Sequence, residues 1–143
     1  MSIAASLARR PGLYRGHGDG PESGPFVCRI AVAPLPNGGV SLDYEAMSHD
    51  QGLQHEEHTL LVVGPDERDR LYVAHSESPF VTEMVATAPG SSRFRQPEPI
   101  GPFAMEIVIE APSPGHLTYA WWWAPAGSAP VEQSRAEARL DDS

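Results

Sequence analysis

The chain has no lysine, and all ten of its basic residues are arginine. Nineteen acidic residues stand against them, so the formal net charge at pH 7 is −9. This charge, with no basic cluster to offset it, argues against nucleic acid as a partner and against binding to an anionic membrane surface. A lysine-free composition is typical of proteins from GC-rich bacterial genomes, and we therefore predict a bacterial source.

Only one cysteine is present, Cys28, so an intrachain disulfide cannot form and nothing points to an oxidising compartment. Cys28 lies in an apolar run, which predicts a small core residue rather than a nucleophile. No apolar run approaches the length of a membrane span. The segment 1–10 carries its arginines after its apolar residues, unlike a signal peptide. These observations predict a cytoplasmic protein.

The length of 143 residues predicts a single domain over residues 1–143. Residues 1–10 are predicted to be a short N-terminal extension, either one helical turn or a lid, and residues 141–143 a tail. Proline (15) and glycine (13) are frequent, which favours many short strands joined by turns over long helices.

Strand patterns follow one another from residue 12 to the end of the chain. Apolar and polar residues alternate most clearly over 40–48 and 103–111. The last pattern is ambiguous, because its alanine, glutamate and arginine residues also suit a terminal helix. After the glycine-rich opening segment, the predicted strands are 26–34, 40–48, 53–63, 70–76, 81–87, 93–95, 103–111, 116–124 and 131–140. Such spacing predicts an all-β fold, either a sandwich or, preferably, a single antiparallel up-and-down β-barrel of about 8–10 strands, because closure removes exposed edges.

Glycine occupies every second position of residues 16–20 within the opening segment 12–20 (GLYRGHGDG). Glycine inside a strand loses more entropy than other residues and packs poorly, so this run indicates a sharp bend or a close approach of another backbone. Small barrels need such positions to close. The alternative is a mobile glycine-rich loop.

Residues 12–18 (GLYRGHG) and the strand containing His55-Glu56-Glu57 resemble the calycin-type barrels. These include lipocalins and fatty-acid-binding proteins, and the likeness is greatest to the ten-stranded nitrobindin-like group. The resemblance implies a barrel with an internal ligand cavity. In that group a histidine on the last strand binds heme iron, but Ser134 stands at about that position here and no histidine follows His116. We therefore expect no heme and no other cofactor.

Aromatic residues indicate where a ligand would lie. Tyr119, Trp121 and Trp123 share one face of their strand, and the preceding strand presents Phe103, Met105, Ile107 and Ile109 on one face. In most small proteins such residues form core, but a barrel of about ten strands is too wide for side chains to fill. We therefore predict a cavity with the ligand-binding residues Tyr44, His55, His75, Phe103, Met105, Tyr119, Trp121 and Trp123.

Arg29 and Arg135 also fall within strand patterns. An inward-facing arginine could clamp a ligand carboxylate through paired hydrogen bonds, as in fatty-acid carriers. Exposure of both side chains to water is the favoured interpretation.

Four histidines, His49, His55, His58 and His75, lie in one part of the sequence. On a strand, a separation of three residues places His55 and His58 on opposite faces, so they cannot share one ion and we expect no metal site. His55 and Glu57 share a face, which His75 could join from a neighbouring strand. This group is either an acid–base pair or, preferably, a hydrogen-bonded polar pair.

Three functions remain possible. The preferred one is a protein that binds a small apolar, aromatic or fatty-acid-like ligand inside the barrel. The alternative is an enzyme on the same scaffold, an isomerase, cyclase or hydrolase of bacterial secondary metabolism, in which His55 and Glu57 move protons. A third is an interaction module without a cavity that forms a homodimer through a strand edge or an aromatic patch.

Overall fold

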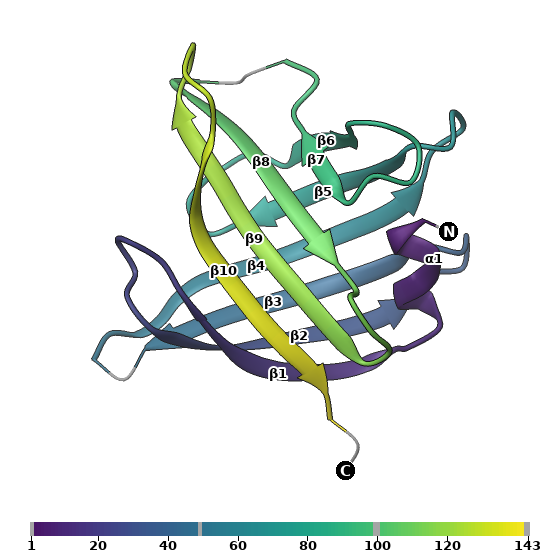
Figure 1. Cartoon of the computed structure of the whole chain (residues 1–143), viewed down its shortest axis with the longest axis horizontal. Helices are drawn as coiled ribbons and strands as arrows, with labels where there is room; N and C mark the ends of the chain where they lie inside the picture. The colour runs from purple at the N-terminus through teal and green to yellow at the C-terminus, as the bar shows by residue number, and fades with distance from the viewer. Residues whose placement is uncertain (1, 49, 99–100, 142–143) are drawn as a thin grey trace.

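Ten strands close into one antiparallel barrel in the computed structural model (Figure 1). The structure describes residues 2–48, 50–98 and 101–141. Each strand pairs with the next along the chain, and the first strand pairs with the last, which confirms the predicted up-and-down barrel and excludes a sandwich. The strands are β1 (Gly12–Asp19), β2 (Phe26–Pro34), β3 (Val40–Ser48), β4 (Gly52–Val63), β5 (Asp69–His75), β6 (Thr82–Ala86), β7 (Arg93–Arg95), β8 (Phe103–Glu110), β9 (His116–Pro125) and β10 (Val131–Leu140).

The observed strand bounds follow the sequence closely. Those of β2, β3, β7 and β10 are the predicted ones, and the other strands differ by one residue at one or both ends. The ambiguous segment 131–140 is a strand, because its backbone pairs with β1 on one side and β9 on the other. Pairing on both sides outweighs the helix propensity of its alanines. The side chains of Ala136 and Ala138 point into the barrel and are buried, and Glu137 between them is exposed.

The glycines of β1 lie where the barrel closes. An added Cβ at Gly16 would overlap the Glu137 carbonyl oxygen, and one at Gly18 would overlap the Arg135 carbonyl oxygen and the Phe26 ring. Only a residue without a side chain allows β10 to approach this closely. The predicted close approach is therefore confirmed, and the alternative of a mobile loop is wrong.

A short helix, α1 (Ile3–Ala8), covers one end of the barrel (Figure 1). The Ser2 hydroxyl caps it by accepting a hydrogen bond from the Ala5 N–H at 3.1 Å. Its apolar face is buried through Ile3, Ala4 and Leu7. The predicted N-terminal extension thus forms part of the packed interior. With six residues, α1 is far too short to cross a bilayer. No helix in the described part of the chain is long and apolar enough to do so.

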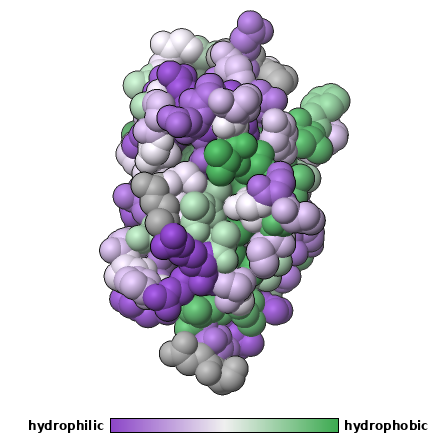
Figure 2. All heavy atoms as spheres, turned by 90° about the vertical axis from the view of Figure 1, so that its right-hand side faces the viewer, coloured by the Kyte–Doolittle hydropathy of each residue, from purple (hydrophilic) through white to green (hydrophobic). Residues whose placement is uncertain are grey.

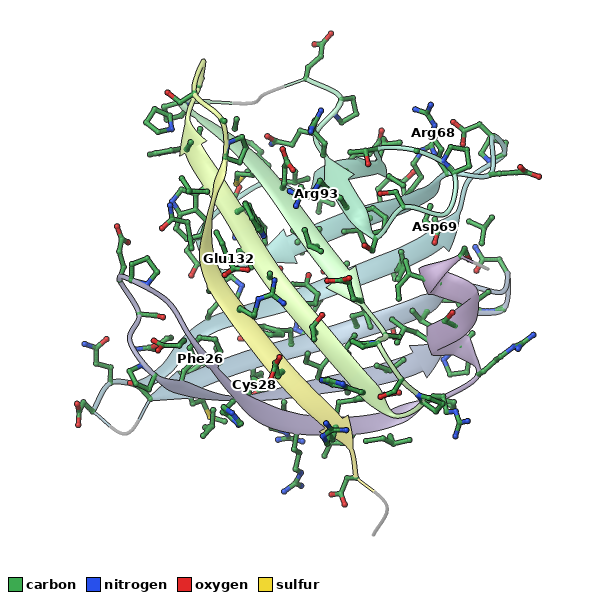
Figure 3. All side chains as sticks on the ribbon, in the orientation of Figure 1. Phe26, Cys28, Arg68, Asp69, Arg93 and Glu132 are labelled. Carbon is green, nitrogen blue, oxygen red and sulfur yellow. The ribbon has the colours of Figure 1, made fainter. Side chains whose placement is uncertain are left out.

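Asp69, at the start of β5, anchors this helix to the barrel (Figure 3). One of its carboxyl oxygens accepts a hydrogen bond from the Ala4 N–H at 3.1 Å. Burial raises the pKa of Asp69, although this backbone contact opposes the rise. At the other terminus, the Asp141 N–H donates to the Leu13 carbonyl at 2.8 Å. The rest of the predicted tail, residues 142–143, lies outside the described residues.

The half of the barrel next to α1 is filled by apolar side chains. They are completely buried, and each stabilises the fold by about 1.5–3 kcal/mol through removal from water. This solid core includes Ile30, Leu42, Leu61, Leu71, Ile107 and Leu117. Cys28 is also buried, as predicted, and burial raises the pKa of its thiol to about 11 against the opposing effect of a backbone hydrogen bond from Gly16.

Candidate ligand-binding site

The half of the barrel away from α1 contains a cavity of about 810 Å³. Residues from four inter-strand connections surround its mouth, including Glu22, Gln51, Glu77 and Pro102. Its volume lies within the range of about 300–1,000 Å³ that is usual for small-molecule sites. The barrel is therefore solid at one end and hollow at the other.

Most of the residues predicted to bind a ligand line this cavity. Tyr44, His55 and His75 do so from β3, β4 and β5, and Trp121, Trp123, Phe103 and Met105 from β9 and β8. Tyr119 does not. Tyr119 is 1% exposed and pairs with Ile109, closer to the filled end of the barrel than Trp121, so it lies beneath the cavity.

Strand register brings the polar residues of the cavity together. Tyr44 on β3 lies opposite Glu57 on β4, and Glu57 lies opposite His75 on β5. Because directly opposed residues point to the same face of a sheet, all three side chains face the barrel interior. His55, two residues before Glu57, shares that face.

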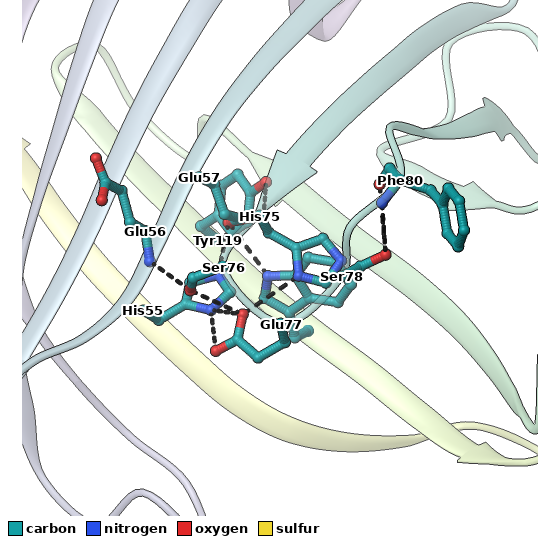
Figure 4. A network of polar contacts seen from close by, with 10 residues as sticks. His55, Glu56, Glu57, His75, Ser76, Glu77, Ser78, Phe80 and Tyr119 are labelled. Atoms are coloured by element: carbon teal, nitrogen blue, oxygen red, sulfur yellow. Dashed lines mark hydrogen bonds and ion pairs between the residues drawn. The ribbon is translucent and has the colours of Figure 1, made fainter.

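Glu57 joins opposite walls of the barrel at the floor of the cavity (Figure 4). Its two carboxyl oxygens accept hydrogen bonds from the Tyr119 hydroxyl at 3.3 Å and from the Trp121 indole N–H at 3.2 Å. The His55 Nε2 atom lies 3.3 Å from the same carboxyl group, but off the line of a hydrogen bond. Three polar groups thus compensate the burial of Glu57, which is 1% exposed.

Glu77, in the turn after β5, completes the cluster (Figure 4). Its carboxylate contacts His55 Nδ1 at 2.6 and 2.8 Å, His75 Nδ1 at 3.2 Å and the Ser76 hydroxyl at 3.1 Å. Burial alone would raise the pKa of Glu77, but the hydrogen bonds from the two histidines lower it below its usual range. Glu77 is therefore a carboxylate at the inner rim of the cavity.

His55 lies between these two carboxylates. Burial alone would lower the pKa of its imidazole, but the close contacts with the carboxylates of Glu57 and Glu77, and their negative charges, outweigh that effect and raise the pKa to about 9. His55 is consequently a cation at neutral pH. Both of its ring nitrogens face carboxylates of the protein.

Aromatic rings pack around the cluster. Tyr44 stacks on Tyr119 with ring centroids 5.1 Å apart, and it meets His55 edge to face at 5.7 Å. The His75 ring lies 5.2 Å from that of Trp121. Burial, with the nearby Glu57 charge as a further cause, raises the pKa of both tyrosines, so their hydroxyls stay protonated.

The remaining histidines do not join the site. His58 is 63% exposed on the outer face, where its ring contacts Asp43 at 2.9 Å and Glu56 at 3.3 Å. His55 and His58 thus lie on opposite faces of β4, as predicted. His49 lies outside the described residues. Among those described, no group of three or more histidine, cysteine, aspartate or glutamate side chains has a metal-binding arrangement.

Neither candidate arginine reaches the cavity. Arg29 is exposed on β2, and Arg135 pairs with Glu132 at 2.9 Å, so the favoured interpretation of both was correct. On β10 the cavity is lined by Gln133 and Ser134. These side chains do not fit heme iron ligation from the last strand, because neither supplies the nitrogen or sulfur ligand that heme proteins use.

Sequence analysis missed Glu22 and Glu77, the two carboxylates at the cavity surface. Both lie in turns, where strand alternation gives no indication of direction, and an acidic residue in a turn ordinarily faces solvent. Only the spatial proximity of the turn after β5 to His55 shows what Glu77 does.

Comparison with known proteins gives the fold and no family. No family model matches the sequence, and no curated protein matches it. The structure is similar to the S-type phycobiliprotein lyase CPES from Guillardia theta, with a TM-score of 0.62 and 12% identity over 100% of this chain and 94% of that one. It is also similar to Rv2717c from M. tuberculosis, with a TM-score of 0.60 and 15% identity over 99% of both chains. At such identities the likeness concerns architecture alone: this protein is a ten-stranded antiparallel barrel.

Proposed function

We propose that the protein binds one small, mainly aromatic or apolar molecule inside the barrel, for sequestration or delivery. The observation that carries this proposal is the cavity of about 810 Å³, which has aromatic walls and a polar cluster at its floor. Apolar walls with a few placed polar groups are typical of small-molecule sites. Trp121 and Trp123 offer ring faces, while Tyr44 offers a hydroxyl that could orient the ligand.

We propose a likeness to the nitrobindin-like group in the shape of the barrel only, and not in its ligand. The opening glycine pattern supports the likeness, since it serves the closure of this barrel. Because β10 lacks a heme-ligating side chain, we propose a use of the cavity that does not involve heme.

An enzymatic role, as an isomerase, cyclase or hydrolase, is a weaker candidate. Acid–base catalysis requires a titrating group directed at the reacting molecule. The raised pKa of about 9 makes His55 an acid rather than a base at neutral pH, and both of its ring nitrogens face Glu57 and Glu77. The contacts therefore support a structural polar pair of His55 and Glu57, held by charge, rather than an acid–base pair.

An interaction module without a cavity receives less support. The barrel is closed, so the described strands leave no unpaired edge for a partner strand. On the face seen in Figure 2, at the end that α1 covers, hydrophobic side chains are scattered among hydrophilic ones rather than gathered in one broad patch. A homodimer remains a prediction that size measurement in solution would test.

The binding proposal is tested with N-phenyl-1-naphthylamine, an apolar aromatic probe that gains fluorescence on leaving water. We expect the unchanged protein to bind it. In an Ala46→Phe variant the new ring points into the cavity, and we expect at least about tenfold weaker binding. Ala31→Phe, the same change on the outer side of β2, is the matched control and should bind normally. No fluorescence gain with the unchanged protein, or equal gain in both variants, would refute the proposal.

Native mass spectrometry of the freshly purified protein is the complementary measurement. A bound molecule would appear as a mass above that of the polypeptide and would be lost in the Ala46→Phe variant. This experiment would also identify the ligand, which the fold similarity does not.

A further inference from the structure

Acidic side chains outnumber cationic ones at the cavity surface. Glu22 and Glu77 line the cavity directly, and Glu57 lies just beneath its floor. Among the described residues that line the cavity there is no arginine, and the chain has no lysine. Within the described ranges, the basic side chains at this surface are those of His55 and His75.

The positive charge of His55 is already compensated within the protein. Nδ1 contacts Glu77 at 2.6 Å, and Nε2 lies 3.3 Å from Glu57. One imidazolium between two carboxylates leaves a formal charge of −1 on the trio. The His55 Nε2 atom has no hydrogen-bond partner among the described residues, but it is buried, so an anionic ligand would not reach it and would meet the negative charge of Glu77.

His75 leaves one ring nitrogen without a partner. Its Nδ1 lies 3.2 Å from the Glu77 carboxylate, which favours the tautomer with the ring proton on Nδ1. The Nε2 atom has no hydrogen-bond partner among the described residues, although the side chain is only 7% exposed. This nitrogen is itself buried, so the polar group of the cluster that a ligand can reach is the Glu77 carboxylate.

Aromatic faces beside these acceptors suit a cation. The Trp121 ring lies 5.2 Å from His75 and 6.1 Å from His55, so it is directly adjacent to the acidic cluster. Trp123 and Tyr44 line the same space. The negative face of an aromatic ring attracts an ammonium group by about 0.5–2 kcal/mol, most strongly where water is excluded.

We infer that the ligand is an aromatic or apolar molecule carrying a protonated amine, and that the cavity rejects carboxylates such as fatty acids. This inference rests on the proposed binding function and names the class of ligand for the same cavity. The ammonium group lies between the Glu77 carboxylate and the Trp121 ring, and the apolar part of the ligand extends toward Trp123 and the mouth.

The test compares three dansyl probes that share one fluorophore and differ only at the far end. Dansylcadaverine ends in a primary amine, its N-acetyl derivative is uncharged, and dansyl-aminohexanoate ends in a carboxylate. Fluorescence titration at pH 7 gives a Kd for each. We expect the amine to bind at least about tenfold more tightly than the acetyl probe, which is about 1.4 kcal/mol, and the carboxylate to bind most weakly.

Three variants locate the origin of this preference. Glu77→Gln removes the inner carboxylate and should bring the affinities of the amine and acetyl probes close together. Its side chain is 54% exposed, so the variant should fold. Glu137→Gln removes the same charge from the outer face of β10 and should leave the preference unchanged. Glu22→Gln, at the mouth, should reduce the preference by a smaller factor because water screens that group.

The outcomes separate the two proposals. If the acetyl or carboxylate probe binds as tightly as the amine, or if Glu77→Gln keeps the full preference, the charge inference is wrong while binding in the cavity stands. If none of the three probes binds, and N-phenyl-1-naphthylamine does not bind either, the proposed function is wrong and the inference with it.

Discussion

Replacing His55 with glutamine will remove most of the pH dependence of stability between pH 6 and pH 9. In the folded protein burial disfavours the imidazolium, but Glu57 and Glu77 more than compensate and raise the pKa from 6.5 to about 9. The folded state therefore holds this proton more tightly than the unfolded chain does. The resulting stabilisation is complete below pH 6.5 and is lost as the pH rises through 9.

The magnitude follows from the two pKa values. The difference between 6.5 and about 9 corresponds to about 3 kcal/mol, at about 1.4 kcal/mol for each pH unit. The His55 side chain is 18% exposed, so water screens its ion pairs only in part. We expect the unchanged protein to lose about 3 kcal/mol of unfolding free energy between pH 6 and pH 9, and the His55→Gln variant to lose much less.

Urea denaturation at a series of pH values measures this effect. His58→Gln is the matched control, because His58 also contacts two carboxylates but is 63% exposed. Such exposed pairs contribute at most about 1 kcal/mol, so the control should keep nearly the full pH dependence. The buried Cys28 thiol, with a pKa of about 11, titrates above this range. A flat stability profile in the unchanged protein, or an unchanged slope in His55→Gln, would refute the charge state assigned to the cluster.

Three further predictions concern the barrel seam, the cavity floor and the last strand. Gly16→Ala should lower the unfolding free energy by more than about 2 kcal/mol, because the added methyl group overlaps the β10 backbone. His17→Ala, on the outer face of the same strand, should change the unfolding free energy by less than about 0.5 kcal/mol. Equal melting temperatures for the two variants would contradict the close approach of β1 and β10. Tyr119→Phe should lower the unfolding free energy by about 1–3 kcal/mol, because the buried Glu57 carboxylate loses one of its hydrogen-bond donors. An unchanged denaturation midpoint would show that this hydrogen bond is dispensable. Hemin should give no Soret shift with the unchanged protein. Ser134→His should produce one, because it adds an imidazole to the cavity wall on the last strand. A shift with the unchanged protein would contradict the expectation that no heme binds.

Strand positions were predictable because they depend on local patterns. Alternation over residues 40–48 placed β3 correctly. The glycines of β1 showed that another backbone comes close, although not which one. The nature of β10 was not predictable, because its composition suits a helix and only pairing with β1 and β9 makes it a strand.

Part of the candidate site was also predictable. Period-two geometry places His55 and Glu57 on one face of β4 and His58 on the other, and the contacts of all three agree. The depth of each residue was not predictable. Tyr119 and Trp121 follow the same pattern, yet one lies beneath the cavity and the other lines it.

The amino-acid sequence by itself determined most of the strands and their inward faces, because each follows from the backbone geometry of neighbouring residues. Tertiary structure alone decided that α1 and the apolar side chains fill only one end, which leaves the other end hollow. It also decided that Glu57 meets β9 across the barrel and that Glu77, from a turn, holds both histidines. These contacts join residues far apart in the chain, so they arise only when the ten strands have closed in register.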